Sequence, residues 1–353
     1  MEKKRVVVTG MAALTPVAES MQETWEALVA GRSGIGSVTQ FDASAYAVKI
    51  AGEVDFNPEA MLDFKEAKRM ARFSQFCVVT AKTLLRDAGW EIPPEGSPGL
   101  GTIIGTGMGE LALLESMHAR MLKMGVRRIS PFLISAIGNM APGFASIYIG
   151  AKGINLAVST ACASGLHALG MAADEIRMGR IDAAVCGGVE ANVAPMAFAG
   201  FGALRALSKR NDDPKAASRP FDRDADGFVI AEGCGLLLLE ELDHAKQRGA
   251  NILAEVMGSG ATGDAADWTS PAADGEGLRR AVAMALRDAG QEAGDIDVVY
   301  ANGLSSPLAD LAETQALKAA LGERAYQVPV TALKSMLGHM IGAAGGVQTA
   351  SLV

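Results

Sequence analysis

Cysteine and aromatic residues are scarce in this chain of 353 residues. Its four cysteines are Cys77, Cys162, Cys186 and Cys234, with no C-x-x-C pair and no histidine cluster at zinc-binding spacing. The sequence therefore predicts neither a disulfide framework nor a metal site. Aromatic residues make up only 5% of the chain, against 49% hydrophobic residues overall, which favours close packing of helices on sheets by small side chains.

Basic charge and long apolar runs are lacking as well. The chain has 32 Lys and Arg against 40 Asp and Glu, so its formal net charge is −8, which argues against a nucleic acid or an anionic membrane as partner. The first apolar strand stops at Gly10 and is too short for a signal peptide. No later stretch reaches the length of a membrane span. We therefore expect a cytoplasmic protein.

Short apolar runs alternate with longer helical segments along the whole chain. The runs expected as strands lie at residues 5–10, 100–107, 153–159, 182–188, 235–241, 251–258, 296–303 and 328–335. This alternation predicts an α/β protein with a buried, largely parallel sheet.

A faint internal repeat divides the chain. Residues 154–170 and 326–346 share one plan, in which an apolar strand is followed by a polar turn and a Gly/Ala-rich helix. The opening strand likewise corresponds to residues 251–260. We therefore predict two pseudo-repeated halves, residues 1–250 and 251–353.

Cys162 is the best candidate for a nucleophile. It follows the expected strand at 154–158, and a helix begins at or just after it. A helix N-terminus lowers a thiol pKa from roughly 8.5, and its N–H groups can hold an oxyanion. The alternative is a small buried cysteine in a tight helix. His167 lies roughly 140° around that helix from Cys162 and is expected to be structural.

The second half offers partners for this cysteine. Lys334 and His339 lie at the corresponding strand-to-helix junction, so the repeat predicts that they face Cys162. Asn302 precedes Gly303, and Asn-Gly is a strong hairpin signal, but helical residues 308–321 follow instead of a second strand. Asn302 therefore lies between a strand and a helix, where α/β sheets place active-site residues.

Four motifs, STACASG, GFGALRALSKRNDDP, RPFDRDADGFVIAEGCG and KSMLGHMIGAAGG, resemble the β-ketoacyl-acyl carrier protein synthases of the elongating type. The resemblance covers essentially the whole chain. It implies a thiolase fold with α-β-α-β-α layers, a homodimer, and chain extension in fatty-acid or polyketide biosynthesis. In that family a cysteine takes an acyl chain from acyl carrier protein, malonyl-carrier protein loses CO2, and the enolate attacks the thioester. No cofactor is implied, because phosphopantetheine arrives on the carrier protein.

The resemblance assigns roles to individual residues. The catalytic positions are Cys162, Lys334, His339 and the substituted position Asn302. The substrate-binding positions are Met108, Phe132, Phe201 and Thr269. Carrier-protein docking is implied for the basic segment with Lys65, Lys68 and Arg69, for which a solvated helix face is the alternative.

The chain departs from the family pattern in three places. The family usually has Asn-Ala-His-Gly-Thr-Ser-Thr-Pro-Leu, whereas this chain has YANGLSSPL, so Asn302 replaces the first catalytic histidine. Gln348 stands where a glutamate usually faces the lysine. The sequence also stops at Val353, before the family's Gly-Phe-Gly-Gly loop, which implies an incomplete C-terminal half.

These departures leave three functions open. The asparagine amide still donates N–H bonds to a thioester carbonyl or an enolate, as at a similar position in thiolases, but it cannot relay a proton. The chain is then an elongating synthase, a non-elongating acyltransferase or hydrolase, or a chain-length-determining subunit of a ketosynthase heterodimer. A nicotinamide oxidoreductase is disfavoured, because Gly105, Gly107 and Gly109 lack the G-x-G-x-x-G spacing.

Overall fold

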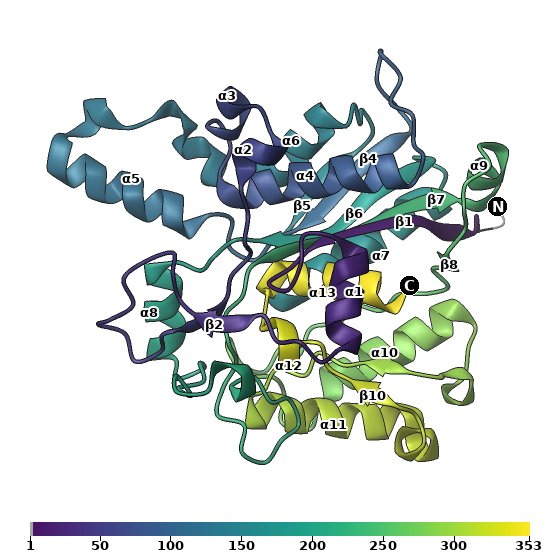
Figure 1. The fold of residues 1–353 in the computed structure, drawn as a ribbon. Coiled ribbons are helices and arrows are strands. Elements are labelled where there is room, and N and C mark those ends of the chain that lie inside the picture. The colour runs from purple at the N-terminus through teal and green to yellow at the C-terminus, as the bar shows by residue number, and fades with distance from the viewer. Residues whose placement is uncertain (1–2) are drawn as a thin grey trace.

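The computed structural model describes residues 3–353. Its main sheet has six strands in the order β5-β4-β6-β7-β1-β8 (Figure 1). Their bounds are Asn155–Val158 (β5), Leu100–Gly105 (β4), Ala183–Glu190 (β6), Gly233–Glu241 (β7), Val6–Leu14 (β1) and Ala254–Glu255 (β8). The expected runs at these positions are thus confirmed as strands, although only two residues of the run at 251–258 are in β8.

The predicted sheet direction was only partly right. Strands β5, β4 and β6 are parallel, but β7 is antiparallel to both of its neighbours and β8 is antiparallel to β1. The error has a physical cause. A strand that is buried on both faces is an apolar run whichever way it points, so hydrophobic periodicity carries no information on direction.

Helices cover both faces of this sheet. Leu236 and Leu238 of β7 belong to the apolar cluster shared with α4 (Arg72–Asp87) and α6 (Met140–Tyr148). Leu237 and Leu239 point to the opposite face, where the cluster includes α7 (Ser164–Arg177) and α13 (Ala344–Leu352). The alternation follows from the two-residue period of a strand.

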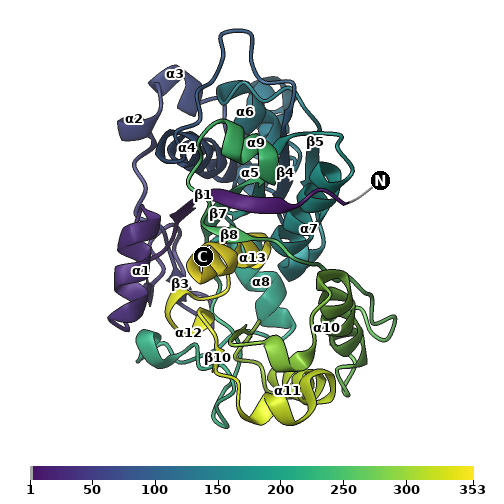
Figure 2. The same cartoon turned by 90° about the vertical axis from the view of Figure 1, so that its right-hand side faces the viewer.

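A second, smaller sheet lies beyond α7 and α13. It pairs β9 (Val299–Tyr300) with β10 (Val330–Thr331) in parallel. Helices α10 (Glu276–Ala289) and α11 (Pro307–Leu321) pack on each other at the outer side (Figures 1 and 2). The layers therefore follow the predicted α-β-α-β-α order.

The remaining elements surround these layers. They are α1 (Met21–Val29), β2 (Ile35–Ser37), β3 (Ile50–Gly52), α2 (Pro58–Met61), α3 (Phe64–Ala67), α5 (Leu111–Met124), α8 (Pro195–Ala203), α9 (Leu242–Gln247) and α12 (Lys334–Leu337). Helix α5 projects from the body of the molecule (Figure 1). Among residues 3–353, no helix has the length and apolar character needed to cross a membrane.

Candidate active site

Two equivalent turns meet at the centre of the molecule. Cys162 lies in a 3-10 turn, Ala161–Ala163, that leads directly into α7, and the 3-10 turn Ile341–Ala343 leads in the same way into α13. Both turns begin with a residue at positive φ, +51° at Ala161 and +44° at Ile341. The turns contact each other. Such backbone conformations are uncommon outside glycine and cluster at functional sites.

The structure brings Cys162 and His339 together. The Cys162 Sγ lies 2.9 Å from the His339 Nε2. The histidine is buried, its backbone N–H donates to the carbonyl of Val229 at 2.7 Å, and its ring packs edge-on against Phe228 with centroids 5.2 Å apart. Burial lowers the pKa of His339 well below its usual value, and the charge of Lys334 lowers it further. The imidazole is therefore neutral at physiological pH.

Lys334 fixes the orientation of the Asn302 side chain. Its Nζ donates to the Asn302 backbone carbonyl at 2.5 Å and to the Asn302 Oδ1 at 3.1 Å. An ammonium group has no acceptor, so the amide atom that faces it must be the oxygen. The Nδ2 group of Asn302 is thereby left to donate elsewhere, and the Asn302 side chain is exposed.

Two carboxylates of α11 hold the loop that carries Asn302. Glu313 accepts the backbone N–H groups of Asn302 at 2.6 Å and Gly303 at 2.8 Å, and Asp310 accepts that of Leu304 at 2.8 Å. Burial raises the pKa of Glu313, and these N–H donors counteract it. Neither Glu313 nor Asp310 is predicted as a site residue from the sequence. The sequence feature that could have identified Asp310 and Glu313 is a pair of acidic residues, three positions apart, in the first turns of the helix that follows the loop.

Lys334 has acidic neighbours, although Gln348 stands where the family resemblance predicts a glutamate. Gln348 donates to the carbonyl of Ala301 at 2.7 Å and so supports the same loop. Burial lowers the pKa of Lys334 to about 8, while the charges of Cys162, Glu313 and Asp310 oppose this shift. Carboxylates from α11 thus supply negative charge near the lysine.

The expected lowering of the Cys162 pKa was wrong. Solvent reaches Cys162 in the single chain, yet the protein packed around it raises the thiol pKa, and this outweighs the lowering by Lys334. The helix position could be seen in the sequence, whereas the packing could not. Desolvation disfavours a thiolate, so the proton must be removed as the sulfur reacts.

The predicted substrate-binding residues fall into two groups. Met108 and Phe201 pack against one apolar cluster, in which the Phe201 ring lies 5.3 Å from that of Phe228, the ring that contacts His339. Phe132 is 41% exposed and lies outside that cluster. Thr269 is exposed and its hydroxyl donates to Asp267 at 3.0 Å.

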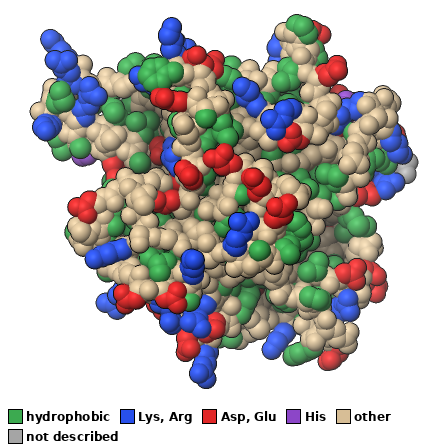
Figure 3. Space-filling model, in the orientation of Figure 1, with side chains coloured by type: hydrophobic (Ala, Val, Ile, Leu, Met, Phe, Trp, Pro, Cys, Tyr) green, Lys and Arg blue, Asp and Glu red, His purple; other side chains and the backbone are tan. Residues whose placement is uncertain are grey.

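His167 and the predicted docking residues make contacts that involve neither Cys162 nor His339. His167 bonds to the Thr160 hydroxyl at 2.8 Å, in keeping with a structural role. Lys65, Lys68 and Arg69 are exposed on and after α3, and the Lys68 Nζ lies 3.7 Å above the ring of Phe64. Basic side chains also protrude from the projecting end of the molecule that carries α5 (Figure 3).

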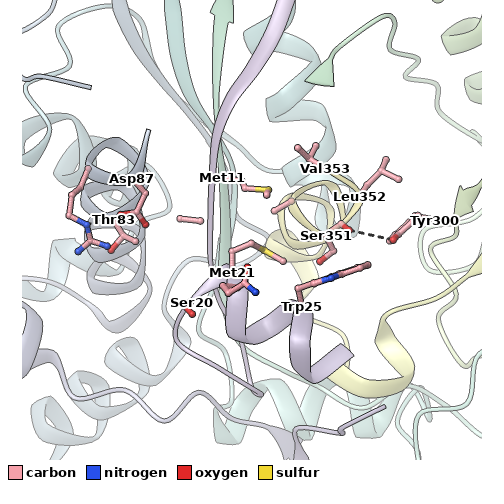
Figure 4. A pocket seen from close by; sticks show the side chains of 14 residues that line it. Met11, Ser20, Met21, Trp25, Thr83, Asp87, Tyr300, Ser351, Leu352 and Val353 are labelled. Atoms are coloured by element: carbon pink, nitrogen blue, oxygen red, sulfur yellow. Dashed lines mark hydrogen bonds and ion pairs between the residues drawn. The ribbon is translucent and has the colours of Figure 1, made fainter. Parts of the chain in front are cut away.

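Two cavities in the part of the chain that the structure describes have neither Cys162 nor His339 in their walls. One of about 560 Å³ lies between β1, α1 and α4 and the end of α13, with Met21, Trp25 and Tyr300 in its wall (Figure 4). None of the candidate catalytic residues lines it. A smaller one of about 190 Å³ is lined in part by Asn302 and Glu313.

Comparisons with known proteins place the chain in a family. Residues 3–245 match the β-ketoacyl synthase N-terminal domain and residues 253–353 the β-ketoacyl synthase C-terminal domain. A protein of Synechocystis named 3-oxoacyl-[acyl-carrier-protein] synthase 2 is 47% identical over 100% of this chain and 85% of its own length. A protein of the same name from Vibrio cholerae is 46% identical over 99% of this chain and 85% of its own length.

Solved structures agree with this placement. One, titled as a type II polyketide synthase acyl carrier protein in complex with its ketosynthase bound to the hexaketide, has a TM-score of 0.90 and 33% identity, covering 99% of this chain and 85% of the other. Another, the ishigamide ketosynthase/chain length factor, has a TM-score of 0.91 and 33% identity, with 98% and 84% covered. The chain therefore belongs to the β-ketoacyl synthase family and has its thiolase fold.

Proposed function

We propose that the chain is a β-ketoacyl-carrier-protein synthase acting in fatty-acid or polyketide biosynthesis. The observation that carries the proposal is the 2.9 Å contact between the Cys162 Sγ and the His339 Nε2, beside the Lys334–Asn302 pair. Relatives that share almost half of its residues are named 3-oxoacyl-acyl-carrier-protein synthases, which supports the same reaction class for this chain.

The first step is acyl transfer to Cys162. The sulfur attacks the carbonyl of an acyl thioester, and the bond between the acyl carbon and the carrier sulfur breaks. The thiol proton passes to the His339 Nε2 and from there to the thiolate sulfur of the departing carrier, which leaves as a thiol. A neutral His339, with a pKa well below the usual value, is free to accept that proton.

The second step is decarboxylative condensation. A malonyl thioester loses CO2, and the electrons of the broken C–C bond form an enolate. Asn302 Nδ2 stabilises the enolate oxygen together with the His339 Nε2–H, which forms when the proton of the neutral imidazole moves from Nδ1 to Nε2 after the acyl transfer. The enolate carbon attacks the acyl group on Cys162, the bond between the acyl carbon and the Cys162 sulfur breaks, and the thiolate takes up a proton from solvent. The product is a β-ketoacyl chain, two carbons longer, on the carrier protein.

A second candidate is an acyltransferase or hydrolase that does not elongate, and the observation that favours it is Asn302 itself. Unlike histidine, the amide cannot take up or release a proton in the physiological range. If condensation needs proton transfer at this position, the acyl group stays on Cys162 until another thiol or water removes it.

Partners follow from the same chemistry. We propose that acyl carrier protein docks at Lys65, Lys68 and Arg69, in line with the solved ketosynthase that holds its carrier protein. We also propose a homodimer, with a heterodimer with a related ketosynthase as the alternative. In either case we propose that Phe132, which is 41% exposed in the single chain, joins the acyl pocket at a subunit contact. We also propose that Thr269, which is exposed, contacts the substrate.

Mass spectrometry of the intact protein tests the proposal. The protein is incubated with octanoyl-carrier protein and then with malonyl-carrier protein, with Cys162→Ala as the control for the acylation site. We expect an octanoyl adduct on Cys162 and then a ketoacyl product that is longer by two carbons. An adduct that never extends would support the non-elongating candidate, and Asn302→His would then restore elongation. A chain that takes up no acyl group has neither function.

A further inference from the structure

One buried carboxylate joins three segments around the candidate active site. Glu190 ends strand β6, and its side chain is inaccessible to solvent. Its Oε2 accepts the backbone N–H groups of Gly107 at 2.7 Å and Gly342 at 3.0 Å, and its Oε1 accepts that of Met108 at 3.3 Å. The Asn192 amide donates to Oε1 as well. Each carboxylate oxygen therefore accepts two hydrogen bonds.

These segments are also in direct backbone contact. A Cβ on Gly342 would lie 2.5 Å from the Gly107 nitrogen, and a Cβ on Gly107 would lie 2.6 Å from the Ile341 side chain. Met108, next to Gly107, borders the apolar cluster of the predicted acyl pocket, and Gly342 follows His339 by three residues. A small shift of one segment therefore moves the other.

We propose that Glu190 is a positioning residue that holds the Met108 turn against the turn after His339 and thereby sets which acyl chains reach Cys162. The inference rests on the proposed function, in which Cys162 accepts an acyl chain. It goes beyond that function because it makes one carboxylate responsible for both the wall of the pocket and the placement of the histidine turn.

Only a carboxylate satisfies this arrangement, because every group that faces Glu190 is a donor. A glutamine would turn its NH2 group toward two of those donors in either orientation. Asn192 cannot turn over to compensate. Its Oδ1 accepts the N–H of Leu111 at 3.0 Å, and its Nδ2 also donates to the carbonyl of Gly109 at 2.9 Å. Substitution at Glu190 must therefore displace the turns.

The test compares long and short acyl donors. Single-turnover acylation of Cys162 is measured with dodecanoyl- and butyryl-pantetheine thioesters, which need no carrier docking. In Glu190→Gln we expect the rate with the dodecanoyl donor to fall roughly tenfold relative to the butyryl donor, since misplacement by about 1 Å can cost ~100-fold in rate. A purely structural role, or displacement of the histidine turn without a change in the pocket wall, would lower both rates together and leave their ratio unchanged.

Glu240→Gln is the matched control. Glu240 is as buried as Glu190, and its carboxylate bonds to Arg248 and His244. It lies at the opposite end of the β6–β7 strand pair, where Glu240 pairs with Ala183, whereas Glu190 pairs with Gly233. This variant should lower Tm and leave the ratio of the two acylation rates unchanged.

The results distinguish failure of the Glu190 inference from failure of the proposed function. A folded Glu190→Gln variant with the original chain-length ratio overturns the inference alone. If the unsubstituted protein is never acylated, the proposed function falls and the inference falls with it. If Glu190→Gln does not fold, Glu190→Asp gives the test, because it keeps the charge but shortens the reach by one methylene. If neither variant folds, Glu190 supports only the fold, and the inference is overturned.

Discussion

At the scale of single residues, Lys334 links the two sides of the site. Its ammonium group holds the carbonyl and amide oxygens of Asn302, and its charge acts on Cys162 and His339. The group is buried at 3% exposure, so water screens this charge only weakly. A cation placed in this way affects both the orientation of a donor and the reactivity of the thiol.

Lys334→Met should therefore make Cys162 less reactive at neutral pH. The positive charge lowers the pKa of the thiol, so its removal raises that pKa and decreases the thiolate fraction at any pH below it. We expect alkylation by iodoacetamide at pH 7 to slow by roughly tenfold. Because Lys334 has a pKa of about 8 and loses its proton above that pH, the two proteins should converge in alkaline buffer.

Peptide mass spectrometry measures the pH profile of the reaction, which is the rate of Cys162 alkylation at each pH from 6 to 10. Lys82→Met, on the exposed side of α4, is the control and should leave the profile unchanged. Identical profiles for Lys334→Met and the unsubstituted protein would show that the lysine charge does not reach the thiol.

Single residues also show where prediction from the sequence stops. The repeat predicted that Cys162 and His339 face each other, because equivalent strand-to-helix turns meet across the pseudo-repeat, and the 2.9 Å contact fits. The Lys334–Asn302 bond and the donors around Glu190 depend on side-chain conformations and loop paths that no periodicity encodes. The raised Cys162 pKa depends on packing in the same way.

At the scale of elements, glycine allows helix α13 to approach the sheet closely. A Cβ on Gly346 of α13 would overlap the carbonyl oxygen of Gly235 on β7 and lie 2.7 Å from the nitrogen of Gly188 on β6. Backbone atoms cannot yield as a flexible side chain can. This contact sets the depth of α13, and therefore the position of the turn before it and of His339.

Gly346→Ala should destabilise the protein by several kcal/mol, because overpacking costs about 1–3 kcal/mol even where side chains can adjust. Gly143→Ala is the matched control, since Gly143 lies within α6 and a Cβ there meets no atom within 4 Å. Alanine should stabilise that helix by about 0.5–1 kcal/mol. Urea unfolding curves measure both. A Gly346→Ala variant as stable as Gly143→Ala would mean that α13 can move away from the sheet at little cost.

Element positions were predicted better than their pairing. Strong apolar runs gave β1, β4, β6 and β7, and the helix after Asn302 begins at Pro307, one residue before the expected start. The reversed direction of β7 was missed, because the buried Leu236–Leu239 run is apolar on both faces. Direction depends on the path of the long connection between β6 and β7, which has no repeating pattern.

At the scale of the whole molecule, the repeated layers explain why one site contains residues from both halves of the chain. Helices α7 and α13 lie side by side between the two sheets, and the turns that precede them meet. Cys162 therefore comes from the first half and Asn302, Lys334 and His339 from the second. The arrangement leaves the nucleophile accessible while His339 and Lys334 are buried.

The charge of the whole molecule makes carrier docking depend on a local patch. The chain has a net charge of −8, so an acidic carrier protein is repelled by the molecule as a whole, and the proposed docking at Lys65, Lys68 and Arg69 rests on local attraction by these side chains. We expect the double variant Lys68→Glu, Arg69→Glu to slow acyl transfer from acyl-carrier protein by roughly tenfold at low ionic strength, and the difference to shrink in about 0.5 M salt, where the Debye length is only a few ångströms.

Stopped-flow or quenched acylation of Cys162 measures this rate, and an acyl-pantetheine thioester should react equally with both proteins because it needs no docking. Lys318→Glu on α11, in the outer layer on the far side of the second sheet, is the control for a change of charge alone. An unchanged transfer rate at low salt would reject the patch and leave it as a solvated helix face. Equal slowing with the thioester would instead place the effect in the active site, since only the carrier-bound donor has to meet the patch before it reaches Cys162.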